Sequence, residues 1–248
     1  GAYVGADWGQ IGRIVGEDVV QSCGAESGTS GKVAVVQGDL TSAASIEQLR
    51  AFKAALEVDS SITIVSEQDA AWDASKANTI TATVLQQHPD LCATFGFWGT
   101  MQNGAAQAVK AAGKTDQVKV YASGEGNRQD CTNVSDGLFY KFLNYSAPKQ
   151  GEAIMSTIGF MLQSGLAPQD IRMAHYSRPF WVTKDNVDPA MCFDVPVAFA
   201  IPAACALQSR SGHVSDPFSV DVFPCLFFLL GAWFCSWSYV EGRRSDDA

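Results

Sequence analysis

Side chains suited to binding a small polar ligand follow several segments that the pattern predicts to be strands. In a parallel sheet these positions share one rim, where ligands bind. Three of the six tryptophans fall there. An indole covers the apolar face of a sugar ring, while carboxylates and hydroxyls bind its hydroxyl groups. The pattern therefore favours a carbohydrate site, with the candidate residues Asp7, Trp8, Trp72, Trp98, Ser123 and Glu125.

For two of these tryptophans, a purely structural role is an alternative to ligand binding. Trp8 and Trp72 could pack over the first turns of helices that Asp7 and Asp73 cap. Trp98 is different, because the glycine that follows it allows the backbone to approach another group closely.

Catalytic patterns are weak. None of the three histidines, His88, His175 and His213, lies on the rim, so a Ser/His/Asp or Cys/His arrangement has no base. Segments 28–33 and 124–129 fail the phosphate-loop and dinucleotide patterns. The seven cysteines form no CxxC pair, which argues against zinc. We predict a protein that is not an enzyme and binds no metal or cofactor.

The composition excludes some partners and leaves the redox compartment open. A formal charge of −9, with no run of Lys and Arg, argues against nucleic acid as a partner. Cys131 and Cys192 lie in loop-like sequence that would allow a disulfide. No signal peptide is visible after Gly1, so we expect that it was removed or that the true beginning is missing.

The first half of the chain alternates apolar strands with amphipathic helices. This alternation predicts an α/β fold with a doubly wound parallel sheet covered on both faces. The predicted strands are 2–6, 32–38, 61–67, 92–97 and 118–123, and the predicted helices are 10–23, 44–56, 74–87 and 100–112.

The second half begins with a predicted loop at 124–137 and a strand at 138–145. Pro148 then opens a helix, and residues 171–186 resemble a loop and a final strand. We expect a ligand-binding domain at 1–145, a crossover helix and strand at 146–190, and an atypical tail at 191–248. The helix carries one apolar face, formed by Ile154, Met155, Ile158, Met161 and Leu162.

The tail contains an uncharged apolar run at 222–240, followed by arginines. Its length meets the crude criterion for a membrane span. Three interpretations stay open: a membrane anchor, an unnatural read-through or frame-shifted tail, and a buried helix.

The segments 5–20, 31–56, 70–114 and 183–186 resemble the sugar-binding class of periplasmic solute-binding proteins, the ribose-binding-like group that serves ABC importers. The resemblance covers about residues 3 to 190. It implies the second, C-terminal lobe of a type I periplasmic binding protein, with a partial first lobe and an unrelated C-terminal tail. Without the first lobe, the apolar face of the helix after Pro148 would be exposed or would pack in a non-native way. The isolated chain would bind sugars weakly or not at all, because half of the clamp is missing.

The resemblance also assigns ligand positions. Gln48 stands where ribose binders have an arginine, and Trp72 matches the family's aromatic residue. Trp98 replaces an asparagine, and Ser123 replaces an aspartate. These changes imply a sugar or polyol other than ribose.

The resemblance implies a periplasmic monomer that delivers its ligand to an ABC permease. Two alternatives are the effector-binding domain of a lac-repressor-type transcription regulator and a membrane-anchored sugar sensor. The first would need a helix-turn-helix before the first lobe, and the second would need run 222–240 to span a membrane.

Overall fold

A six-stranded sheet organises the described part of the protein. The structure is a computed structural model that describes residues 1–194. The strands of this sheet are β2 Lys32–Gln37, β3 Thr63–Asp69, β4 Ala93–Gly96, β5 Lys119–Gly124, β6 Lys141–Asn144 and β8 Phe180–Thr183. They lie in the order β3-β2-β4-β5-β6-β8. All neighbours are parallel except β6 and β8, which are antiparallel.

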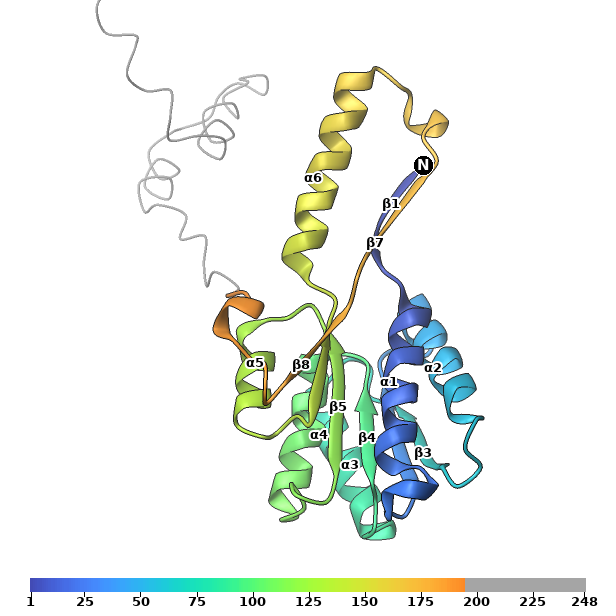
Figure 1. Cartoon of the computed structure of the whole chain (residues 1–248), viewed down its shortest axis with the longest axis vertical. Helices are drawn as coiled ribbons and strands as arrows, with labels where there is room; N and C mark the ends of the chain where they lie inside the picture. The colour runs from blue at the N-terminus through green and yellow to red at the C-terminus, as the bar shows by residue number, and fades with distance from the viewer. Residues whose placement is uncertain (195–248) are drawn as a thin grey trace, which may run out of the picture. The chain divides into compact units, whose positions relative to one another are not determined.

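Helices cover both faces of this sheet (Figure 1). They are α1 Trp8–Cys23, α2 Ala43–Leu56, α3 Ala74–Gln87, α4 Gly99–Ala111 and α5 Arg128–Ser135. Alternate strand residues face opposite sides. Val33 and Val35 accordingly join a core with α1 and α2, whereas Ala34 joins a second core with α3, α4 and α5. The predicted doubly wound α/β fold with a largely parallel sheet is confirmed.

The first predicted strand belongs elsewhere. β1 Ala2–Ala6 pairs in parallel with β7 Met173–Ser177 in a separate two-stranded ribbon. Its side chains are too exposed for a central strand of a covered sheet, and Tyr3 is 44% exposed. The ribbon contacts α6 Ala147–Ser164 and lies beside it in Figure 1.

Two local predictions were wrong. Segment 124–137, predicted as a loop, contains α5. The Asp130 N–H donates to the Asn127 side chain at 3.1 Å, and the Asn127 N–H donates to the Asp130 carboxylate at 3.2 Å. This reciprocal capping starts a helix in a segment whose Gly, Asn and Asp content indicated a loop.

The second wrong prediction concerns residues 171–186, which form two strands, β7 and β8, instead of one. Single 3-10 turns lie at Ala25–Ser27, Pro168–Asp170 and Pro189–Met191.

The apolar face of α6 is exposed, as the resemblance implied. This helix has no fully buried residue. Met155 is 67% exposed and Leu162 is 78% exposed, and Ile154 and Ile158 are also exposed. The helical spacing was predicted correctly, but within residues 1–194 no other element covers this face.

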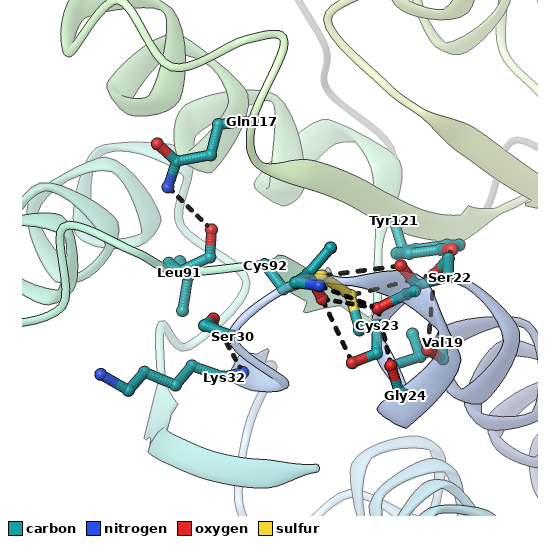
Figure 2. The surroundings of a disulfide bond; sticks show 12 residues. Val19, Ser22, Cys23, Gly24, Ser30, Lys32, Leu91, Cys92, Gln117 and Tyr121 are labelled. Carbon is teal, nitrogen blue, oxygen red and sulfur yellow. Dashed lines mark hydrogen bonds between the residues drawn. A yellow bond between two sulfur atoms is a disulfide. The ribbon is translucent and has the colours of Figure 1, made fainter. Parts of the chain in front are cut away.

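Two disulfides connect distant segments. One joins Cys131 in α5 to Cys192 after β8, the bridge that the sequence allowed. The other joins Cys23 at the end of α1 to Cys92 before β4 and was not predicted (Figure 2). Beside it, the Ser22 and Tyr121 hydroxyl oxygens lie 2.8 Å apart.

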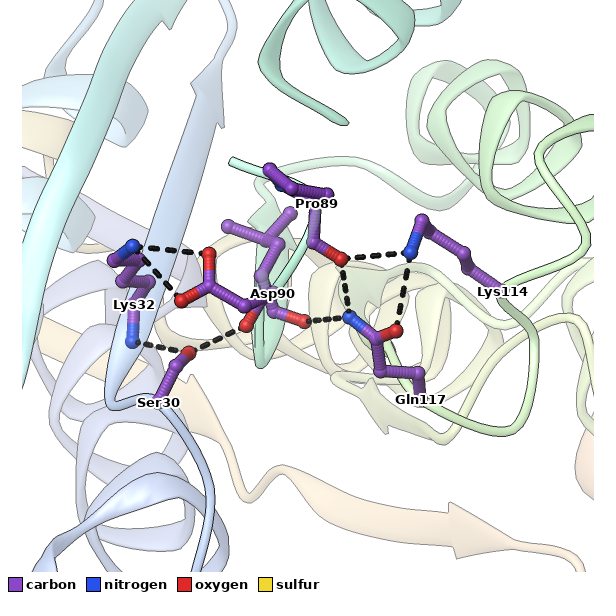
Figure 3. Close-up of polar contacts among 7 residues, drawn as sticks. Ser30, Lys32, Pro89, Asp90, Lys114 and Gln117 are labelled. Atoms are coloured by element: carbon purple, nitrogen blue, oxygen red, sulfur yellow. Dashed lines mark hydrogen bonds and ion pairs between the residues drawn. The ribbon is translucent and has the colours of Figure 1, made fainter. Parts of the chain in front are cut away.

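The turn before β4 is held by polar contacts at the amino end of the strands (Figure 3). Lys32 Nζ lies 2.8 Å from the Asp90 carboxylate. The Lys114 ammonium and the Gln117 amide donate to the Pro89 carbonyl at 2.7 and 2.8 Å. These exposed contacts fix a turn on the side of the sheet away from the predicted rim.

The chain divides into two units, residues 1–195 and 196–248. Within residues 1–194, no helix is long and apolar enough to cross a membrane. The apolar run 222–240 and nearly all of the predicted tail at 191–248 lie outside the described residues.

Candidate functional site

An aromatic hollow of about 320 Å³ lies where strands of the sheet end at their carboxyl side. The elements that meet there are the starts of α1, α2 and α4 and the segments after β3, β4, β5 and β6. Parallel strand order brings these segments together although they are far apart in the sequence. The lining residues are Trp8, Ala44, Trp72, Phe97, Trp98, Glu125 and Tyr145.

Trp98 and Glu125 form the polar centre of this hollow. Trp98 immediately precedes α4, and its indole N–H donates to both Glu125 oxygens at 2.8 and 3.0 Å. A charged acceptor strengthens such a hydrogen bond. The bond therefore holds the Trp98 ring in one orientation. Its partner Trp72 meets it edge to face, with ring centroids 6.4 Å apart and planes at 78°.

The position of Trp72 depends on backbone geometry and on a glycine. Ala71 and Trp72 have φ angles of +48° and +62°, the left-handed region that side chains rarely adopt. This conformation costs energy, and such strain gathers at binding sites. A Cβ atom on Gly38, after β2, would lie 2.2 Å from the Trp72 ring. Gly38 therefore allows the indole to lie close over the end of β2.

Trp8 lies against a residue that the sequence analysis missed. Its ring meets Tyr145 edge to face, with centroids 5.4 Å apart. Burial, followed by the negative charges of Glu125 and Asp130, raises the pKa of the Tyr145 hydroxyl. Tyr145 ends the predicted strand 138–145. Applying the rule about positions at strand ends to this strand would have found it.

Asp7 has the structural role that the sequence left open. Its carboxylate accepts a hydrogen bond from the Gln10 N–H at 2.9 Å and so caps α1. Asp73 caps α3 in the same way, through the Lys76 N–H at 2.7 Å. Asp7 lines a different hollow, of about 700 Å³, beside α1 and α2. Trp8 and Trp72 therefore do begin or precede capped helices, and they also line the aromatic hollow.

Gln48 and Ser123 come together below the rim. Both are fully buried, and the Ser123 hydroxyl donates to Gln48 Oε1 at 2.9 Å. The Gln48 amide donates to the Ala44 carbonyl at 3.2 Å. Neither residue lines the hollow. They lie beneath it, because Gln48 bonds to Ala44 and Ser123 bonds to the Phe97 carbonyl at 3.2 Å, and both partners line the hollow. Their contact with a ligand stays a prediction.

Asp130 is a second carboxyl group near Glu125. Its side chain is buried, and Oδ1 has no hydrogen-bond partner in the described part of the chain. Burial, and then the charge of Glu125, raise its pKa to about 7. A Cβ atom on Gly99 would lie 2.1 Å from Oδ1, so only glycine fits at the start of α4.

The chemistry available here is that of binding. Aromatic faces and one half-buried carboxylate can hold a ring with hydroxyl groups, as the sequence predicted. Asp130 is buried and does not line the aromatic hollow, so among residues 1–194 the half-buried Glu125 carboxylate has no acid partner there. Within residues 1–194, no three His, Cys, Asp or Glu side chains gather to hold a metal ion.

Comparison with known families agrees with this fold. A family model described as periplasmic binding protein domain matches residues 2–165, well over half of the chain. The chain belongs to this family, which confirms the resemblance drawn from its sequence.

Two curated relatives are named for sugars. The chain is 32% identical over 118 residues to the D-ribose/D-allose-binding protein of Pseudomonas aeruginosa, covering 48% of this chain and 35% of that protein. It is 34% identical over 119 residues to the D-allose-binding periplasmic protein of Escherichia coli K12, covering 48% and 37%. The matches thus span little more than a third of each relative.

A solved structure shows the same fold. It is an ABC transporter periplasmic solute-binding protein from Actinobacillus succinogenes 130z with bound D-allose. The TM-score is 0.65 at 23% identity, and the match covers 74% of this chain and 62% of that one. At this identity the likeness concerns the fold.

Proposed function

We propose that this chain forms the sugar-binding part of a periplasmic substrate-binding protein that delivers a small sugar or polyol to an ABC permease. The protein binds its ligand and does not transform it. The observation that carries the proposal is the pairing of Trp98 with Glu125 inside a hollow lined by aromatic rings. Family membership and the names of the two curated relatives support it.

In this proposal the aromatic rings and Glu125 contact different parts of the sugar. A ring of Trp98 or Trp72 covers the C–H face of the sugar, and Glu125 accepts hydrogen bonds from hydroxyl groups. Each Glu125 oxygen is an acceptor for the Trp98 N–H and keeps lone-pair capacity for a ligand. The protein acts as a monomer, and ligand-dependent closure against a second lobe presents it to the permease.

The two disulfides support the periplasmic location. They join Cys23 to Cys92 and Cys131 to Cys192 within the described residues. Such bonds persist in oxidising compartments, including the bacterial periplasm.

The experiment is a titration of the ¹⁵N-labelled chain with D-allose, D-ribose and ribitol, followed through the tryptophan indole N–H signals. NMR detects the weak binding that we expect of this chain alone. At least one ligand should shift the Trp8, Trp72 or Trp98 signal in a saturable way, whereas the Trp181 signal in β8 should not move.

Two variants sharpen the result. Trp98→Ala should weaken binding by about 1 to 3 kcal/mol, the range for a buried aromatic contact. Trp181→Phe is the matched control and should bind as the parent chain does. If none of the three ligands shifts any rim indole at saturating concentration, the proposed function is contradicted.

A further inference from the structure

Among the described side chains that line the aromatic hollow, Glu125 is the charged one. Its hydrogen-bond donor in the described residues is the neutral indole of Trp98. Arg128 and Glu125 both line a neighbouring hollow of about 390 Å³, but the Arg128 guanidinium is paired with Asp194. Within the part of the chain that the structure describes, the hollow therefore holds a carboxylate without a matching cation.

In α5, the described helix that follows Glu125, the one cation is Arg128, which is paired with Asp194, and the carboxyl group of Asp130 has a raised pKa. Asp130 in α5 is buried near Glu125, and the charge of Glu125 helps to keep its proton bound. On the α2 side, the buried side chain is the neutral Gln48, whose oxygen accepts from Ser123. An opposite charge inside the hollow would thus be attracted by Glu125, and no described side chain that lines it would repel that charge.

The aromatic walls of the hollow also favour a positively charged ligand. The faces of Trp and Tyr rings attract cations when these lie within about 6 Å of the ring centre. Trp8, Trp72, Trp98 and Tyr145 line the hollow around Glu125. A protonated amine therefore gains an ion pair with the carboxylate and cation–π contacts with the rings, whereas a neutral hydroxyl gains only a hydrogen bond to the carboxylate.

Building on the proposed function, we propose that the ligand is a sugar or polyol that carries a protonated amine. The ammonium group binds the Glu125 carboxylate and donates to both oxygens. The apolar face of the same ligand lies against Trp98 or Trp72. This assignment narrows the substrate class from neutral sugars to amino sugars and amino polyols.

The experiment compares D-glucosamine, D-glucose, N-acetyl-D-glucosamine and ethanolamine with the full 248-residue chain at pH 6.5. The indole N–H signals of the rim tryptophans report binding. D-glucosamine should bind at least about tenfold more tightly than the two neutral sugars, which corresponds to about 1.4 kcal/mol. Ethanolamine should bind more weakly than D-glucosamine, because it offers no ring to the tryptophans.

Two further measurements test the role of the charge. Glu125→Gln should abolish the preference for the amine, whereas Asp136→Asn, at an exposed position after α5, should retain it. In the parent chain the preference should shrink as salt is raised, which needs no variant. If D-glucose binds as tightly as D-glucosamine, the amine assignment is overturned and sugar binding stands.

Two further outcomes separate a failure of the sugar part of the assignment from a failure of the proposed function. If ethanolamine binds as tightly as D-glucosamine, the hollow is a simple cation site and the sugar part of the assignment fails. If none of these ligands, and none of D-allose, D-ribose and ribitol, shifts a rim indole, the proposed function itself fails.

Discussion

Asp130 links the environment of the hollow to the pH dependence of folding. Burial and the charge of Glu125 raise the pKa of this carboxyl group from 3.8 to about 7. A carboxyl group with a higher pKa in the folded state binds more protons when folded, so stability falls as pH rises from about 4 to 7. At 1.36 kcal/mol for each pKa unit, Asp130 alone removes about 2.5 kcal/mol of stability between pH 5 and pH 8.

The substitution Asp130→Asn tests this value. It removes the titrating group and keeps a side-chain oxygen for the Asn127 N–H. Urea unfolding of both proteins at pH 5, 6, 7 and 8 gives the free energies of unfolding. Relative to the parent chain, the variant should gain about 2.5 kcal/mol between pH 5 and pH 8.

A control separates this group from the other carboxylates. Asp136→Asn replaces an exposed carboxylate just after the same helix and should follow the parent curve at every pH. A constant difference between Asp130→Asn and the parent chain across this range would show that Asp130 does not titrate there. The physical reasoning about its burial would then be refuted.

The remaining predictions concern the Cys23–Cys92 disulfide and the close approach of Gly38 to Trp72. Replacing both Cys23 and Cys92 by Ser should lower the free energy of unfolding by about 2 to 4 kcal/mol, because the bridge closes a loop of sequence separation 69. Urea titration under oxidising conditions measures this loss, and equal stability would contradict it. Gly38→Ala should displace the Trp72 indole and weaken sugar binding about tenfold, since the new Cβ would lie 2.2 Å from the ring. NMR titration measures this change, and an unchanged dissociation constant would show that the indole position does not matter.

Local patterns in the sequence were sufficient for much of the fold. The helix at 74–87 was predicted with its observed bounds, because Asp73 provides a cap and apolar residues recur at helical spacing. Trp72 and Trp98 were found because the carboxyl ends of parallel strands share one edge. Trp8 follows β1, which lies outside this sheet, and it lines the same hollow from the start of α1. Both inferences need only short-range order and the alternation of strands with helices.

The sequence therefore determined the fold class and placed Trp8, Trp72, Trp98 and Glu125 at one rim. Only the tertiary structure decided which side chains meet. Gln48 and Ser123 lie 75 residues apart in sequence and bond to each other beneath the hollow. The Cys23–Cys92 bridge was equally unforeseen. Strand order and helix packing set such contacts, because they fix the direction of each side chain over distances that local periodicity does not encode.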